Sequence, residues 1–269
     1  MTAGTIDARP SDSLASVLGH VGWCTFVVLA VVGGYTLLAL PIAAWIADPV
    51  VATMAVGGIV ALAVGCARLL RPQLFSYGPA LLPSDGATRL RGFWGWALLA
   101  TALAFLAGQT IALILYGHVG SAGFDRHLDV EQASGRTLVM VLTLVVAPLS
   151  EEALFRGLAY PLLRRRVSIV AATLVTALTF ACMHGNLVQV AATMPLGLVL
   201  ALVAERTRGL WQVVVLHVAY NLAAMLVPPP AIQGLATPQY AVPVAAAWGA
   251  CLAGLFVQAQ SSGSAARRG

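Results

Sequence analysis

The stretch TLVMVLTLVVAPLSEEALFRGLAY, residues 137–160, holds two adjacent glutamates inside a long apolar run. The run is long enough to cross a bilayer, for which a helix needs about 20 mostly apolar residues. A carboxylate in the hydrocarbon core costs on the order of 2.5–3.5 kcal/mol by insertion scales. The chain has only four glutamates, Glu131, Glu151, Glu152 and Glu205. Two of the four therefore lie where burial of a carboxylate costs the most free energy. Because ionisable groups inside a membrane usually serve a function, this pair is the first candidate for a functional site.

The composition of the whole chain indicates a membrane protein. Of its 269 residues, 59% are hydrophobic and only 9% are charged, and the mean hydropathy is +0.88. Soluble domains contain about 25% charged residues, so a water-soluble fold could not cover its surface with this set. The apolar segments lack the alternation and the roughly ten-residue period of a membrane β-barrel. The sequence therefore predicts an all-α, polytopic membrane helix bundle.

We expect eight transmembrane helices within a single transmembrane domain at residues 21–260. A polar N-terminal tail at 1–20 and a disordered C-terminal tail at 261–269 flank this domain, and Pro148 should kink or loosen the fourth span. The spans are expected at residues 22–47, 50–69, 93–116, 137–160, 168–184, 187–204, 210–227 and 239–259.

The arginines test this map. All fifteen basic residues are arginine. If the N-terminus is cytoplasmic, twelve of them fall on the cytoplasmic side, Arg126 and Arg136 fall on the other side, and Arg156 lies in the fourth span. This asymmetry follows the positive-inside rule and supports both termini being cytoplasmic. The excess of positive charge is therefore topological, and we expect no nucleic-acid partner. We expect an integral, multi-pass protein of a bacterial plasma membrane.

Three polar clusters interrupt the apolar spans. In the first, Glu152 and Arg156 stand at i, i+4, share a helix face and can pair. Glu151 points about 100° away from that face, because each residue advances a helix by about that angle. One carboxylate is thereby assigned to structure, and Glu151 is left free to act as a general base.

The other two clusters lie in later spans. Phe180 and His184 form an F-x-x-x-H pattern in the fifth span, and His217 and Asn221 form an H-x-x-x-N pattern in the seventh. An imidazole and a carboxamide can both donate hydrogen bonds to a developing oxyanion. Taken singly, each group also has a plainer interpretation. A histidine or asparagine can join helices by a hydrogen bond, Glu152 and Arg156 can be a structural ion pair, and Phe180 can be packing that holds His184 in one rotamer. Polar groups in separate spans nevertheless usually face one shared interior.

The order E-E-x-x-x-R, F-x-x-x-H, H-x-x-x-N on successive membrane helices resembles the CPBP intramembrane proteases. This family includes the type 2 CAAX prenyl endoproteases and the bacteriocin-processing (Abi) proteins. The resemblance covers residues 137–225, and the first three spans match only in number. It implies hydrolysis of a peptide bond within the membrane, with a membrane-associated peptide or protein as the substrate and the lipid bilayer as the surroundings.

The resemblance also implies a role for each motif residue. Glu151 would be the general base that activates water, assisted by His184. His217 and Asn221 would hold the oxyanion of the tetrahedral intermediate. The remaining motif residues would support the architecture around Glu151, and these are Glu152, Arg156 and Phe180.

The sequence permits two forms of this chemistry. Glu151, His184 and His217 could supply three ligands of an open zinc site. The chain has no H-E-x-x-H motif, and Asn221 suits an oxyanion better than zinc. We therefore favour a mechanism without a cofactor and keep zinc as the alternative.

Simple helix geometry gives a conflicting expectation. At 1.5 Å per residue, straight helices that start at the inner arginines place Glu151 roughly 20 Å deep, His184 roughly 27 Å and His217 roughly 12 Å. The three side chains should then not meet. If residues 158–168 lie along the cytoplasmic interface, the mismatch becomes smaller but does not vanish.

Two other functions compete with the protease. A non-catalytic immunity or scaffold protein of the same family would use the polar cluster for structure alone. A proton-coupled transporter would use the carboxylates as relay groups, although no inverted pair of broken helices is visible in the sequence. Whether a substrate is prenylated, and in which oligomeric state the protein works, does not follow from these residues.

Overall fold

The computed structural model describes residues 14–75 and 86–264, and all of its regular elements are helices. The first thirteen residues, 76–85 and 265–269 lie outside the described residues, and with them most of both predicted tails. The elements are α1 (Leu14–Trp45), α2 (Pro49–Leu70), η1 (Pro72–Phe75), α3 (Gly86–Val119), α4 (Ala122–Ala133), α5 (Arg136–Val141), η2 (Leu142–Val146), α6 (Ala147–Glu152), η3 (Ala153–Ala159), α7 (Tyr160–Arg164), α8 (Ile169–Cys182), α9 (Leu187–Thr207), α10 (Leu210–Leu226), α11 (Pro229–Gln233), η4 (Gly234–Ala236) and α12 (Pro238–Ser264).

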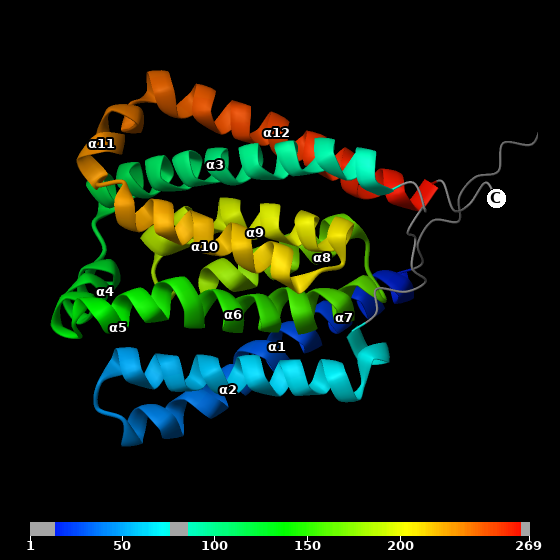
Figure 1. Ribbon diagram of the computed structural model, residues 1–269, viewed down its shortest axis with the longest axis horizontal. Helices are drawn as coiled ribbons and strands as arrows, with labels where there is room; N and C mark the ends of the chain where they lie inside the picture. Colours follow the sequence, from blue (N-terminus) through cyan, green and yellow to red (C-terminus); the bar gives the residue numbers. More distant parts are fainter. Residues whose placement is uncertain (1–13, 76–85, 265–269) are drawn as a thin grey trace, which may run out of the picture.

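The long helices run back and forth across one bundle (Figure 1). In this view α3 and α12 form one side, α1 and α2 form the other, and the green segment α5–α7 lies between them beside α8, α9 and α10. The start of α1 and the end of α12 lie at the same end of the molecule (Figure 1). This arrangement agrees with an even number of crossings.

All eight predicted spans are helical, but not all of them are long enough to cross a bilayer unaided. Six described helices are long and apolar enough to cross a membrane. Leu210–Leu226 and Pro229–Ala236 would together make a seventh, although the chain bends by 99° between them. Ile169–Cys182 has only 14 residues, about 21 Å of helix against a hydrocarbon core of about 30 Å. The all-α membrane bundle is confirmed, while the count of eight and the cytoplasmic termini stay predictions.

Several boundaries differ from those expected. α1 begins at Leu14, inside the predicted tail, because the residues before Val21 continue its apolar helix. α12 likewise continues to Ser264. The segment from Arg136 to Arg164 is one candidate span, so residues 158–164 continue the helix instead of lying along the interface.

Two side chains cap the starts of α8 and α9, and one glycine shapes the turn between these helices. Ser168 accepts a hydrogen bond from Ala171 N at the start of α8, and Asn186 accepts one from Gln189 N at the start of α9. These caps satisfy backbone donors that a helix leaves free at its first turn. Gly185, between α8 and α9, has φ +79°, a conformation that glycine adopts at little cost. α8 thus ends at Cys182, and His184 lies in the turn just before Gly185.

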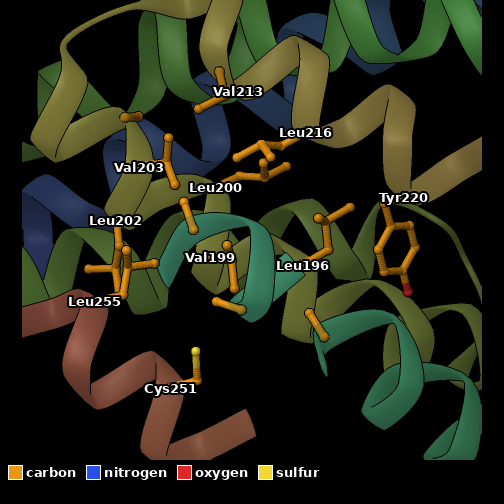
Figure 2. Packing of buried hydrophobic residues seen from close by; sticks show 14 of the residues in the cluster. Leu196, Val199, Leu200, Leu202, Val203, Val213, Leu216, Tyr220, Cys251 and Leu255 are labelled. Carbon is orange, nitrogen blue, oxygen red and sulfur yellow. The ribbon is translucent and has the colours of Figure 1, made fainter. Parts of the chain in front are cut away.

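The apolar core centres on α9. Val199, Leu200 and Val203 are 0% exposed and pack against residues of α3, α10 and α12. Figure 2 shows Leu216 and Tyr220 of α10 directed at this helix. α9 is therefore the central helix of the bundle, and the helices that carry the site pack against it.

Arginines gather at the end of the bundle where α7 and α9 finish. Arg164 makes a two-point ion pair with the buried Glu205, with Nε–Oε2 and Nη2–Oε1 distances of 2.9 and 3.1 Å. Arg165 donates to Gln73 O, and Arg166 lies 4.2 Å from the ring centroid of Trp23. Among the described residues, this clustering of arginines at one end of the bundle is what the positive-inside rule predicts.

Candidate active site

The two glutamates end α6, in the middle of the Arg136–Arg164 helix. This helix is not regular, because a π-helical segment precedes α6 and a second, η3, follows it. π-helical turns widen the helix locally and occur frequently at functional sites. Pro148 lies just after the first π-segment within the continuous helix, where it cannot donate the backbone hydrogen bond that an interior residue normally makes. The predicted irregularity at Pro148 therefore takes the form of a π-segment before the glutamates.

The two carboxylates lie in opposite surroundings. The side chain of Glu152 is 0% exposed, whereas that of Glu151 is 29% exposed. Adjacent residues on a helix point about 100° apart, so one faces the protein interior and the other a more open space. Of the two glutamates, Glu151 is therefore the one that water or a substrate can reach.

Glu152 and Arg156 form the expected ion pair. Arg156 Nη1 donates to Glu152 Oε1 at 2.9 Å, and both side chains are completely buried. Arg156 Nη2 also donates to Gly197 O of α9 at 2.9 Å, and its guanidinium lies 4.8 Å from the ring centroid of Phe180. A buried charge is tolerated only when it is paired and hydrogen-bonded, as it is here. The pair thereby ties the glutamate helix to α9.

His217 of α10 joins the two glutamates. Its Nδ1 lies 2.7 Å from Glu152 Oε1, and its Nε2 lies 3.7 Å from Glu151 Oε2. A carboxylate can only accept, so Nδ1 carries the proton and donates to Glu152. Glu152 thus has a second contact beyond Arg156, which fixes the orientation of the imidazole and presents Nε2 to Glu151.

The predicted mismatch in depth is wrong for His217. Glu151 is about 20 Å of helix from Arg164, and His217 is about 10 Å of helix from Leu210. The two side chains still meet, so the end of α7 at Arg164 and the start of α10 at Leu210 do not lie at equal helix distances from the site. The estimate failed because it assumed straight, parallel helices with a common starting depth.

His184 lies near this group without bonding to it. Its Nδ1 is 3.1 Å from Phe180 O, one turn earlier in α8. The Phe180 ring contacts the rings of both His184 and His217, with centroids 5.3 and 5.8 Å apart in edge-to-face geometry. Among the described residues no hydrogen bond or ion pair joins His184 to Glu151. Phe180 is packing, as expected, and it separates the two histidines.

Asn221 lies one turn beyond His217 on the same face of α10. Its Nδ2 donates to Thr143 O at 2.8 Å. Thr143 belongs to the π-segment η2, so the asparagine bridges α10 to the irregular part of the glutamate helix. A carboxamide nitrogen has two protons, and the second is free to serve another acceptor.

The part of the chain that holds the site is similar to a known protein family. Residues 133–223 match a family model described as Type II CAAX prenyl endopeptidase Rce1-like. This part of the chain is similar to that family, and it is called the Rce1-like domain for this similarity. The match includes every motif residue from Glu151 to Asn221, and it is consistent with a CPBP family intramembrane protease. No curated protein and no solved structure gives a significant match to the chain.

Glu151, His184 and His217 are the three candidate zinc ligands in the Rce1-like domain. In the part of the chain that the structure describes, no group of three His, Cys, Asp or Glu side chains could hold a metal ion. In both histidines Nδ1 faces a protein acceptor, Glu152 Oε1 for His217 and Phe180 O for His184, so zinc stays the alternative to the metal-free mechanism.

Two partners in the Rce1-like domain have no sequence signature. Gly197 and Thr143 supply backbone carbonyls to Arg156 and Asn221. A carbonyl is present at every residue, so no motif could single these two out. The one indirect signal is the small side chain at Gly197, where an added Cβ would lie 3.2 Å from both Ala177 and Phe180.

Proposed function

We propose that the chain is an intramembrane endopeptidase in which Glu151 activates the water that cleaves a peptide bond. The observation that carries the proposal is the contact of His217 with both glutamates across 65 residues of an Rce1-like domain. A partly exposed carboxylate beside an oriented imidazole is an arrangement suited to general acid–base catalysis.

The reaction begins at Glu151. Its carboxylate takes a proton from a water molecule as the water oxygen forms a bond to the peptide carbonyl carbon. The π electrons of the carbonyl move to its oxygen, which becomes the oxyanion. His184 assists through Nε2, which keeps its lone pair because Nδ1–H donates to Phe180 O.

His217 and Asn221 stabilise the oxyanion. The proton held by Glu151 can pass to His217 Nε2, which is 3.7 Å from Oε2. With Nδ1–H still bonded to Glu152, the resulting imidazolium donates from Nε2, and Asn221 donates its second N–H. Preorganised donors of this kind are worth about 10²–10³ each in kcat.

The intermediate then collapses. The carbonyl reforms as the C–N bond breaks, and the nitrogen takes its proton from the imidazolium or from Glu151. The products are a carboxylic acid and an amine, the acid then gives its proton to the amine, and both glutamates and the histidine return to their first states.

The substrate we propose is a membrane-associated peptide or protein, of the CAAX class that the family model names. A farnesylated peptide ending in a CAAX sequence and its unprenylated twin test this choice with the purified protein in lipid nanodiscs. Cleavage of both peptides at equal rates would remove prenylation from the proposal.

The same assay tests the metal-free mechanism. Activity that disappears with a chelator and returns with zinc would show that the reaction depends on zinc.

The function itself is tested in cells. Membrane proteomes of cells with the wild-type chain and with Glu151→Gln are compared, and we expect uncut precursors only in the variant. Glu131→Gln is the matched control, because Glu131 is an exposed acid in α4 that pairs with His127. Identical proteomes for the wild type and Glu151→Gln, together with an unchanged cellular phenotype, would favour a non-catalytic immunity or scaffold protein.

A further inference from the structure

The Glu151 carboxylate lacks a hydrogen-bond donor from its own domain. Its nearest partner is His217 Nε2 at 3.7 Å, and none of the described side chains donates a hydrogen bond to it. Glu152, one residue on, is held by both Arg156 and His217. A general base must lie within hydrogen-bond reach of the proton that it removes, and a donor to the Glu151 carboxylate would hold it in that position.

α1 places a phenol near this carboxylate. Val27 and Val31 are buried at a spacing of four on one face of α1, and Tyr35 follows one turn later on the same face. Tyr35 is partly buried and packs against the cluster that contains Phe155 and Phe180. α1 also contacts η3 and α7, which flank the glutamates on the arginine side (Figure 1).

The register of the two helices places the two groups at about the same level. Trp23 Nε1 of α1 donates to Leu162 O at 3.0 Å. Tyr35 follows Trp23 by about three turns, and Glu151 precedes Leu162 by about the same length of helix. No direct hydrogen bond joins the two side chains in the described structure, and a single bridging water can replace a direct bond at little cost in free energy. Tyr35 lies outside residues 133–223, so the family match gives it no role.

We propose that Tyr35 is a positioning residue for Glu151, donating its O–H to the carboxylate either directly or through one water. The phenol would hold the carboxylate toward the scissile carbonyl while the water is deprotonated. The inference rests on the proposed function, and it makes α1 part of the working site.

The first experiment compares Tyr35→Phe with Tyr116→Phe in cleavage of the farnesylated peptide. Tyr116 is a matched control, since its hydroxyl also donates to a carboxylate, Asp125 Oδ1 at 2.7 Å, but at an exposed position far along α3. We expect Tyr35→Phe to lower kcat about 10- to 100-fold with KM unchanged, as loss of a hydrogen bond to a charged group predicts. Tyr116→Phe should match the wild type. Wild-type kcat in Tyr35→Phe, or a loss confined to KM, would overturn the inference while leaving the endopeptidase intact.

A second experiment is independent of activity. Thermal unfolding of the wild type, Tyr35→Phe, Glu151→Ala and the double variant forms a cycle that isolates the coupling of the two side chains. We expect the change in Tm caused by Tyr35→Phe to become smaller when Glu151 is absent. Equal changes in both backgrounds would overturn the proposed contact even if no peptide is cleaved by any form.

Discussion

At the scale of single residues, the environment divides two identical side chains into two roles. Glu152 is 0% exposed and bonds to Arg156 and His217, while Glu151 is 29% exposed and has His217 Nε2 as its one ion-pair partner among the described residues. The i, i+4 spacing predicted the first pairing and left Glu151 free. It did not predict that Glu152 would also orient the imidazole, because that contact depends on how α10 packs.

The buried ion pair predicts a large effect on stability. Arg156→Met should strand the Glu152 charge inside the bundle, at a cost of about 3–5 kcal/mol for a broken buried pair. The measurement is Tm in detergent or nanodiscs. Glu131→Gln, which breaks the exposed pair with His127, should cost at most about 1 kcal/mol. Equal Tm values for the two variants would contradict the structural role given to Arg156.

The oxyanion role predicts a different kinetic result at Asn221. Asn221→Ala should lower kcat about 10²–10³-fold, since one preorganised donor is removed. Asn186→Ala is the control, because Asn186 is also a helix-associated asparagine but caps α9. Steady-state rates on the farnesylated peptide decide between them. A change in KM alone at Asn221 would indicate binding of substrate and no stabilisation of the intermediate.

At the scale of helices, close packing between α2 and α6 holds the glutamates in place. A Cβ added at Gly57 would lie 2.9 Å from Val146 Cγ1 and 3.1 Å from Ser150 Oγ, next to Glu151. At Gly58 a Cβ would meet nothing within 4 Å. Neighbouring glycines of one helix therefore offer a test of packing against the site.

Gly57→Ala should push α6 away and lower both the Tm and the cleavage rate. Gly58→Ala should keep the rate and raise stability by up to about 1 kcal/mol through helix propensity. Both variants are measured by thermal unfolding and peptide cleavage. A more active or more stable Gly57→Ala would show that the close approach does not matter to the site.

The sequence predicted the helices better than their irregularities. Apolar length and the polar motifs located all eight helical segments, and the bonds within one helix, such as Glu152–Arg156, followed from spacing. The π-segments around α6, the short length of α8 and the partners Gly197 and Thr143 did not follow. These features depend on how separate helices tilt and meet, which periodicity along one helix does not encode.

At the scale of the whole molecule, the charged ends predict an orientation. The described arginines of α7 and α9 lie at the end where α1 begins and α12 finishes, while α4 lies at the opposite end (Figure 1). Alkaline phosphatase inserted after Gly120, beside α4, should be exported and active in a bacterial host. The same enzyme fused after Ser264 should be inactive. The reverse pattern would invert the bundle in the membrane.

The most direct test of the account follows the water molecule. The purified chain in nanodiscs is given the farnesylated CAAX peptide in H₂¹⁸O, and the products are weighed by mass spectrometry. We predict one ¹⁸O in the new carboxylate from the wild type, and cleavage slower by at least about 10²-fold in Glu151→Gln. Labelled product formed by Glu151→Gln at the wild-type rate would contradict the central claim that Glu151 activates the water.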